Sequence, residues 1–169
     1  MTGYRIRLLD RSDEPAFRPV RLDALRLHPT AFGASYEENM QTTPDELARR
    51  LLEPPSFMFG GFSEVGELVG TSGLRLETGA KSRHKGSVFA VYVDAAHRGT
   101  GLAGGLIEAV IAGARDARVS VLHLTVTLGN DAARTLYAAL GFRSYGIERR
   151  GLCVDGVFYD EELMALDLD

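Results

Sequence analysis

The chain has 169 residues, of which 45% are hydrophobic and 25% are charged. This is the composition of an ordinary globular protein with enough residues for one substantial core, so we expect residues 1–169 to form one domain. The net charge of -4 and the pI near 5.6 argue against a protein that binds nucleic acid through a basic face.

The N-terminal part of the sequence predicts a strand followed by a helix. Residues 4–9 alternate between apolar and polar side chains, as a half-buried strand does. The helix is expected to start at Ser12 as its N-cap, to kink at Pro19 and to end before Pro29. The polar segment 30–44 then predicts a loop with one helical turn.

A capping box marks the next helix. Residues 43–46 hold a threonine, then a proline and, at the third helical position, a glutamate, and the helix is expected to stop before the two prolines at 54–55. Residues 56–63 and 67–77 read as two strands joined by a turn. The polar and basic residues 79–86 predict a hairpin loop after them.

The C-terminal half alternates strands and helices. Residues 87–94 are almost continuously apolar, which is typical of a central strand covered on both faces. The remaining pattern predicts a helix over 102–117, a strand over 119–127, a helix over 130–140 that ends at Gly141, and an antiparallel pair over 142–149 and 157–168 joined through residues 151–156. The order indicates an α/β fold with a mixed sheet.

The glycine-rich segment 97–105 lies between the central strand and the following helix. Residues 99–104 match the expression G-x-G-x-x-G of dinucleotide-binding proteins, but residues 94–98 separate the glycines from the strand. That fold also needs an acidic residue about twenty positions on, and the strand 119–127 contains none. No Gly-Lys-Ser or Gly-Lys-Thr follows, so a P-loop is excluded and an NAD(P)-dependent oxidoreductase is disfavoured.

A short loop before a helix still suits an anion. The first amides of a helix have no partner within it, and glycine lets an anion approach them closely. Each charge-assisted hydrogen bond contributes roughly 1.5 to 3 kcal/mol, so several amides can hold a diphosphate. Residues 98–103 fit this interpretation better than that of a simple tight turn, whereas Gly104 and Gly105, inside the helix, fit close packing.

These residues resemble a known family. Arg98-x-x-Gly101-x-Ala103 is similar to the signature Q/R-x-x-G-x-G/A of the GCN5-related N-acetyltransferases (GNAT family). The preceding strand and the segment Asn130-x-x-Ala133-x-x-x-Tyr137-x-x-Leu140-Gly141-Phe142 match the same family in the expected order. The resemblance covers essentially the whole chain. It implies a mostly antiparallel central sheet of about seven strands with helices on both faces.

The resemblance implies acetyl-CoA as cosubstrate. In that family the diphosphate binds the amides of the glycine loop, and the pantetheine arm lies where two parallel strands splay, here residues 87–93 and 120–127. Ala133 would allow close approach, and Asn130 suits both a ligand and an N-cap. The implied binding residues are Val91, Val93, Arg98, Gly99, Thr100, Gly101, Leu102, Ala103, Gly104, Asn130 and Ala133.

Tyr137 matches the general acid of the family, which protonates the leaving thiolate. Taken by itself, Tyr137 suits a half-buried side chain that packs its helix onto the sheet better than an acid, and the match of the whole segment from Asn130 to Phe142 reverses this preference. Many members carry a glutamate base on the strand before the glycine loop, and residues 87–93 contain no acid. Glu37, beside Glu38, is the expected substitute, although a solvated pair is an equal alternative. Further candidates are a water relay and the weaker acidic group Asp160, Glu161 and Glu162.

We therefore expect an N-acetyltransferase that acts on a primary amine of a small molecule or of a peptide or protein N-terminus. The alternative is an inactive acyl-CoA-binding sensor or partner module. No pair of histidines has metal-ligand spacing backed by a cysteine or a carboxylate, so no catalytic metal is predicted. Homodimers are common in the family, and no segment of this sequence demonstrates one.

The sequence also predicts a cytoplasmic protein without a membrane partner. The first residues lack an apolar segment after a basic start, and no run reaches the ~18 to 20 apolar residues that span a bilayer. Cys153 is the single cysteine, which excludes an intramolecular disulfide.

Overall fold

A computed structural model describes residues 3–169. Its strands form one seven-stranded sheet in the order β1-β2-β3-β4-β5-β7-β6, in which only β4 and β5 run parallel. This confirms the expected mixed, mostly antiparallel sheet. The strands are β1 (Arg5–Leu8), β2 (Ser56–Phe62), β3 (Leu68–Leu76), β4 (Lys85–Val93), β5 (Val121–Thr127), β6 (Arg143–Val154) and β7 (Val157–Asp167).

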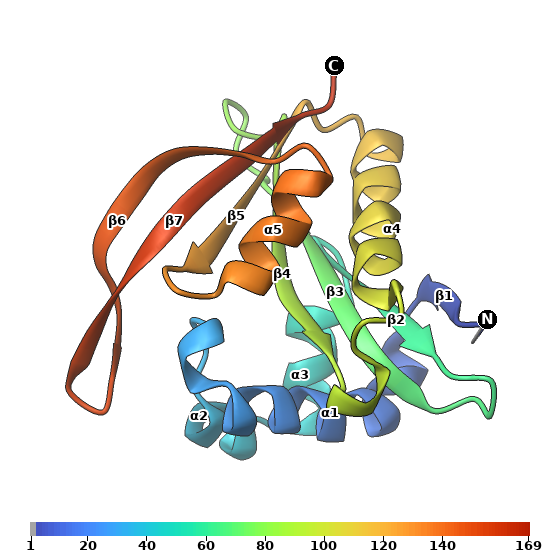
Figure 1. Cartoon of the computed structure of the whole chain (residues 1–169). Helices are drawn as coiled ribbons and strands as arrows, with labels where there is room; N and C mark the ends of the chain where they lie inside the picture. Colours follow the sequence, from blue (N-terminus) through green and yellow to red (C-terminus); the bar gives the residue numbers. More distant parts are fainter. Residues whose placement is uncertain (1–2) are drawn as a thin grey trace.

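Helices cover both faces of the sheet, as expected (Figure 1). On one face α1 and α3 bury side chains such as Phe17 and Leu47 against Met58 of β2. On the other face α4 and α5 bury Ile107 and Tyr137 in a second core cluster. The helices are α1 (Glu14–Leu27), α2 (Tyr36–Gln41), α3 (Pro44–Leu51), α4 (Leu102–Asp116) and α5 (Asp131–Ala139). Within residues 3–169, no helix is both long and apolar enough to cross a membrane.

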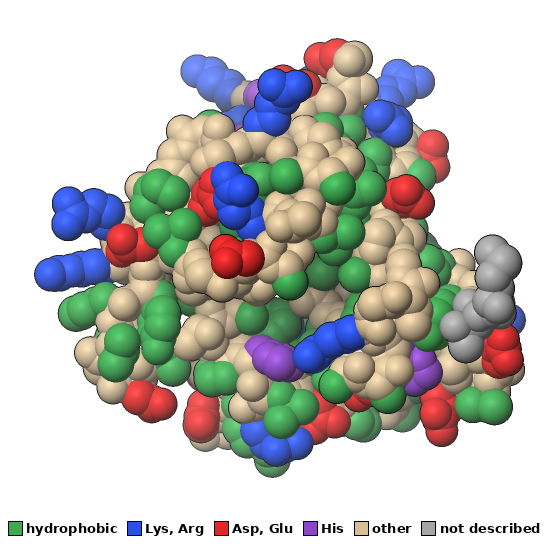
Figure 2. Space-filling model, viewed as in Figure 1, with side chains coloured by type: hydrophobic (Ala, Val, Ile, Leu, Met, Phe, Trp, Pro, Cys, Tyr) green, Lys and Arg blue, Asp and Glu red, His purple; other side chains and the backbone are tan. Residues whose placement is uncertain are grey.

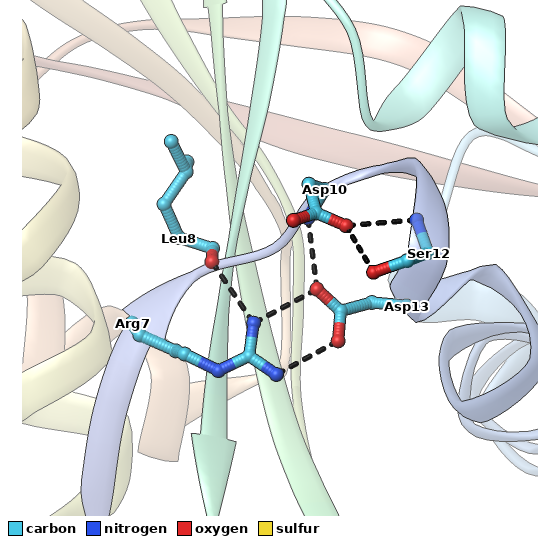
Figure 3. A network of polar contacts seen from close by, with 5 residues as sticks. All are labelled: Arg7, Leu8, Asp10, Ser12 and Asp13. Atoms are coloured by element: carbon cyan, nitrogen blue, oxygen red, sulfur yellow. Dashed lines mark hydrogen bonds and ion pairs between the residues drawn. The ribbon is translucent and has the colours of Figure 1, made fainter.

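The start of α1 differs from the prediction, which placed Ser12 as the N-cap. A 3-10 turn (Arg11–Asp13) precedes α1, and Asp10 caps this turn by accepting from the Ser12 amide at 2.8 Å (Figure 3). Asp13 accepts from the Asp10 amide at 2.8 Å and from both terminal nitrogens of Arg7 at 2.7 and 2.8 Å. The prediction was wrong because Asp10, two residues earlier, caps the preceding turn, while the N-cap of α1 itself is Asp13 and makes no side-chain cap hydrogen bond.

Two other termini follow the prediction and one does not. The Glu46 amide donates to Thr43 Oγ1 at 3.2 Å and the Thr43 amide to Glu46 Oε2 at 3.0 Å, which confirms the capping box. Gly141 has a φ of 97°, as a helix C-cap requires.

The β6–β7 turn, expected over residues 151–156, is shorter, because β6 continues through Gly151. At Gly151 the Glu161 side chain occupies the space that a Cβ would fill.

A bulge in β4 opens the sheet at its centre. Ala90 has a φ of 52°, and the pairing of β3 with β4 shifts by one residue opposite Ser72. Thr71 Oγ1 donates to the Ala90 carbonyl at 2.9 Å and holds the bulge in place. β4 pairs with β5 only from Lys85 to Ser87, and beyond that point the two strands diverge (Figure 1). The divergence leaves one edge of β4 without a partner strand.

Candidate active site

A cavity of about 1040 Å³ lies at the gap between β4 and β5 and reaches both faces of the sheet. Residues of both strands, of the glycine loop and of α5 line it, and so do residues of α1, α3 and β7. Figure 2 shows a hollow near the middle of the view, with a histidine and a basic side chain at its rim. Of the residues predicted to bind cofactor or to act in catalysis, all but Thr100 and Glu37 line the cavity.

The glycine loop needs its glycines for backbone conformation. Gly99 and Gly101 have φ angles of 71° and 87°, and a Cβ at either position would meet nothing within 4 Å. Gly101 is the N-cap of α4 and offers no side chain to the first turn. The amides of Leu102, Ala103 and Gly104 therefore have no side-chain cap, and these residues line the cavity. This arrangement fits the diphosphate of an acyl carrier.

The two glycines inside α4 have different surroundings. A Cβ at Gly105 would lie 2.8 Å from Cδ1 of Ile6, which confirms that Gly105 allows close packing against β1. A Cβ at Gly104 would lie 3.8 Å from Cδ1 of Leu136, an ordinary contact. Packing was predicted for both positions, and the structure requires it only at Gly105.

Arg98 connects the glycine loop to Val93 of β4 and to His28 through hydrogen bonds. Its Nε donates to the Val93 carbonyl at 3.0 Å, and a terminal nitrogen lies 2.9 Å from His28 Nε2. Burial and the charge of Arg98 lower the pKa of His28, so the neutral ring accepts this hydrogen bond near neutral pH. Thr100 donates through Oγ1 to the His97 carbonyl at 2.6 Å and stabilises the loop from outside the cavity.

α5 brings three predicted residues to the cavity. Asn130 accepts from the Ala133 amide at 3.3 Å and is the N-cap of the helix, as expected. Tyr137 is only 6% exposed and packs edge to face against Phe142, with ring centroids 6.0 Å apart. Burial raises the pKa of Tyr137 to about 12, so its hydroxyl is protonated at neutral pH.

The acidic residues considered as the general base differ in whether they line the cavity. Glu37 and Glu38 are exposed on the first turn of α2, and neither lines the cavity. Glu162 is buried and accepts from Arg134 Nε at 2.8 Å; burial opposes its charge, but hydrogen bonds lower its pKa overall. Glu161 lines the cavity, and burial together with the nearby Glu148 raises its pKa.

Sequence reasoning missed three arginines that line the cavity, Arg21, Arg50 and Arg75. A signal for Arg21 was present, since it lies four residues after Phe17 and four before Leu25 on the buried side of α1. Arg50 and Arg75 gave none, because both stand among ordinary surface positions. Within residues 3–169, no group of three or more His, Cys, Asp or Glu side chains is arranged to hold a metal ion.

Known proteins resemble this chain in sequence. The model of the acetyltransferase (GNAT) family matches residues 21–142. N-alpha-acetyltransferase RimI of Mycobacterium tuberculosis is 32% identical over 113 residues, 67% of this chain and 69% of the relative. A mycothiol acetyltransferase of Thermobispora bispora is 32% identical over 151 residues, 86% of this chain and 48% of the relative. This chain thus spans about half the length of the second relative.

Solved structures share the fold. A GNAT-family acetyltransferase from Streptococcus pneumoniae superposes with a TM-score of 0.84 at 23% identity, over 98% of this chain and 99% of that one. A structure from Salmonella typhimurium, which contains its cofactor acetyl-CoA, gives a TM-score of 0.82 at 25% identity, over 99% and 95% of the two chains. The chain belongs to the GNAT family of acetyltransferases and is an acetyl-CoA-dependent transferase.

Proposed function

We propose that the chain transfers the acetyl group of acetyl-CoA directly to a primary amine. The observation that carries this proposal is that the uncapped start of α4 and the β4–β5 gap open onto the same cavity. A diphosphate at the amides of residues 102–104 would direct the arm of the carrier along the free edge of β4, where Val91 and Val93 lie. An amine can then approach the acetyl group through the gap from the α1–α3 face.

We propose that Tyr137 helps the sulfur leave. Bound acetyl-CoA supplies an activated thioester; the amine nitrogen forms the new C–N bond while the C–S bond breaks and its electron pair moves to sulfur. A hydroxyl of pKa about 12 keeps its proton, and full transfer to a thiolate of pKa ~8.5 is uphill by about 5 kcal/mol. We therefore assign Tyr137 as a hydrogen-bond donor to the developing thiolate.

Glu161 is our candidate for the base. An alkylamine of pKa ~10 is neutral only about one part in a thousand at pH 7, so a proton must be removed before attack. Glu161 lines the cavity and its pKa is raised, both of which suit a proton acceptor. Glu37, expected from the sequence to serve as base, lies outside the cavity lining, which supports Glu161 over Glu37.

The decisive experiment separates binding from turnover. Calorimetry with acetyl-CoA measures the affinity, and release of free thiol with a panel of amines, confirmed by mass spectrometry of the product, measures transfer. Binding without thiol release from any amine would identify the inactive acyl-CoA-binding module instead. A rise in melting temperature with NAD(P) and none with CoA would favour the oxidoreductase.

Three sequence-based expectations accompany this proposal. We propose that residues 1–169 act as one domain and that the protein works in the cytoplasm; limited proteolysis and cell fractionation test these points. Light scattering of the purified protein tests the homodimer. The relative named N-alpha-acetyltransferase supports an amine as acceptor.

A further inference from the structure

Three basic side chains from separate elements meet on one side of the cavity. Arg21 comes from α1, Arg50 from α3 and Arg75 from β3. The Arg75 guanidinium lies 4.5 Å from the ring centroid of Phe89, and its Nε donates to Ser56 Oγ at 3.2 Å. Phe89 packs against the core cluster of α1 and α3, so the arginines lie on the face of the sheet opposite to α4.

These arginines have no acidic partner. None of the three forms an ion pair with another residue of the described range, 3–169. Arg21 is only 8% exposed, and its buried Nε has no hydrogen-bond partner. Burial, together with the charges of Arg50 and Arg75, lowers the pKa of Arg21 to about 10, which leaves it protonated at neutral pH. The Arg21 guanidinium lies 5.8 Å from the ring centroid of Phe32 but has no acidic partner. A buried cation without a counter-charge is unfavourable, and a bound anion would reduce the penalty.

We propose that the amine acceptor is a free amino acid whose carboxylate binds Arg21, Arg50 and Arg75. This rests on the proposed acetyl transfer and names the class of its acceptor. Guanidinium groups are suited to carboxylates because their donors form a planar fork that matches the two oxygens.

The opposite side of the cavity, at β7, carries a negative charge that suits the amino group of such an acceptor. Glu161 is the one carboxylate of the cavity lining within residues 3–169, and it belongs to β7. The sheet order places β3 on one side of the β4–β5 gap and β7 on the other. An acceptor that spans the gap would have its acid at the arginines of α1, α3 and β3 and its amine toward the thioester and Glu161. A peptide N-terminus has no free carboxylate next to its amine and lacks this match.

Matched acceptors test the proposal on the intact protein with acetyl-CoA. The panel holds the common L-amino acids, the corresponding amino-acid amides, the amines that lack the acid and a set of short peptides. We expect kcat/KM for the best free amino acid to exceed that of its amide by at least about 100-fold, since an uncharged amide cannot pair with the cluster.

Arg50 and Arg49 provide a matched pair of variants on α3. Arg50→Met should raise KM for the best amino acid about 10- to 100-fold, with an effect on its amide at least tenfold smaller and with the Kd of acetyl-CoA within twofold. Arg49→Met, next to it but outside the cavity lining, should change none of these values. Arg75→Met should repeat the Arg50 result. Arg50 and Arg75 carry the test because both are exposed, whereas replacement of the buried Arg21 endangers folding.

Each other outcome overturns the inference. Equal use of acids and amides, or turnover of peptides alone, would show that the cluster does not bind an acid of the acceptor. A loss of acetyl-CoA affinity in Arg50→Met equal to the loss for the amino acid would assign the cluster to the carrier. Transfer to amines without an acid leaves the proposed function standing, whereas bound acetyl-CoA with no transfer to any amine overturns both.

Discussion

The two walls of the cavity present different chemical groups. Toward α4 lies the backbone wall, the main-chain amides of residues 102–104 after two glycines with positive φ. Toward α1 and α3 lies the side-chain wall, formed by Arg21, Arg50 and Arg75. The positions of main-chain amides depend on the path of the backbone, and few particular side chains are needed to keep them. Side chains can be exchanged one at a time without a change of fold. We infer that the first wall holds the acyl carrier and that the second selects the acceptor.

Gly101→Val should have the largest effect, and it acts on the backbone wall. A β-branched residue at a φ of 87° is strained and would shift the amides of the first turn of α4. Loss of one or two charge-assisted hydrogen bonds predicts a Kd for acetyl-CoA about 100-fold weaker, measured by calorimetry.

Gly66→Val is the control for that strain. Gly66 has a φ of 86° in the β2–β3 turn, and a Cβ there also meets nothing within 4 Å. The two variants should lose similar stability, while only Gly101→Val loses affinity for acetyl-CoA. Equal losses of affinity would mean that backbone strain, not the position of the amides, causes the effect.

Tyr137→Phe should slow the chemical step without weakening the binding of acetyl-CoA or of the acceptor. Without the hydroxyl the developing thiolate loses one hydrogen bond to a charged group, which predicts a kcat about 10- to 100-fold lower. The Kd of acetyl-CoA should stay within twofold, because the ring keeps its packing against Phe142. An unchanged kcat from pH 6 to 9 would limit Tyr137 to a packing role.

Glu161→Gln compares the structural candidate for the base with the one taken from the sequence. It should lower kcat/KM about tenfold, within the range of general-base effects, while Glu37→Gln should stay within twofold. The raised pKa of Glu161 means that the wild-type rate falls as pH drops through a value above 4.5, where the carboxylate gains a proton. Glu161→Gln should lose that part of the pH profile. The reverse ranking of the two variants would return the role to Glu37.

The backbone wall could be predicted from the sequence because its signal is local. Glycines between an apolar strand and an amphipathic helix, followed by the segment from Asn130 to Phe142, identify the loop, the strand pair and α5 by their spacing alone. The capping box at Thr43 and the C-cap at Gly141 were predictable for the same reason, since each depends on a few neighbouring residues.

The side-chain wall could not be predicted because its residues are distant in the chain. Arg21, Arg50 and Arg75 meet only after α1 and α3 pack on the sheet. Glu161 was one of three adjacent acids on β7, and strand alternation decides their roles: Glu162 points to the α5 face and pairs with Arg134, while Glu161 lines the cavity. The choice of Glu37 rested on the resemblance of its loop, and sequence spacing does not show which way α2 faces.

Thr43→Ala should have the smallest effect and concerns the support of the side-chain wall. Thr43 caps α3, which places Arg50 at the cavity and buries Leu47 in the core. Loss of the cap predicts a decrease of about 1 kcal/mol in the free energy of unfolding, or roughly 2 to 4 °C in Tm. KM for the acceptor should rise by less than about threefold. The Kd of acetyl-CoA should not change, because α3 lies on the face of the sheet opposite to α4. An equal change in both constants would mean that the two walls respond together and that specificity cannot be assigned to one of them.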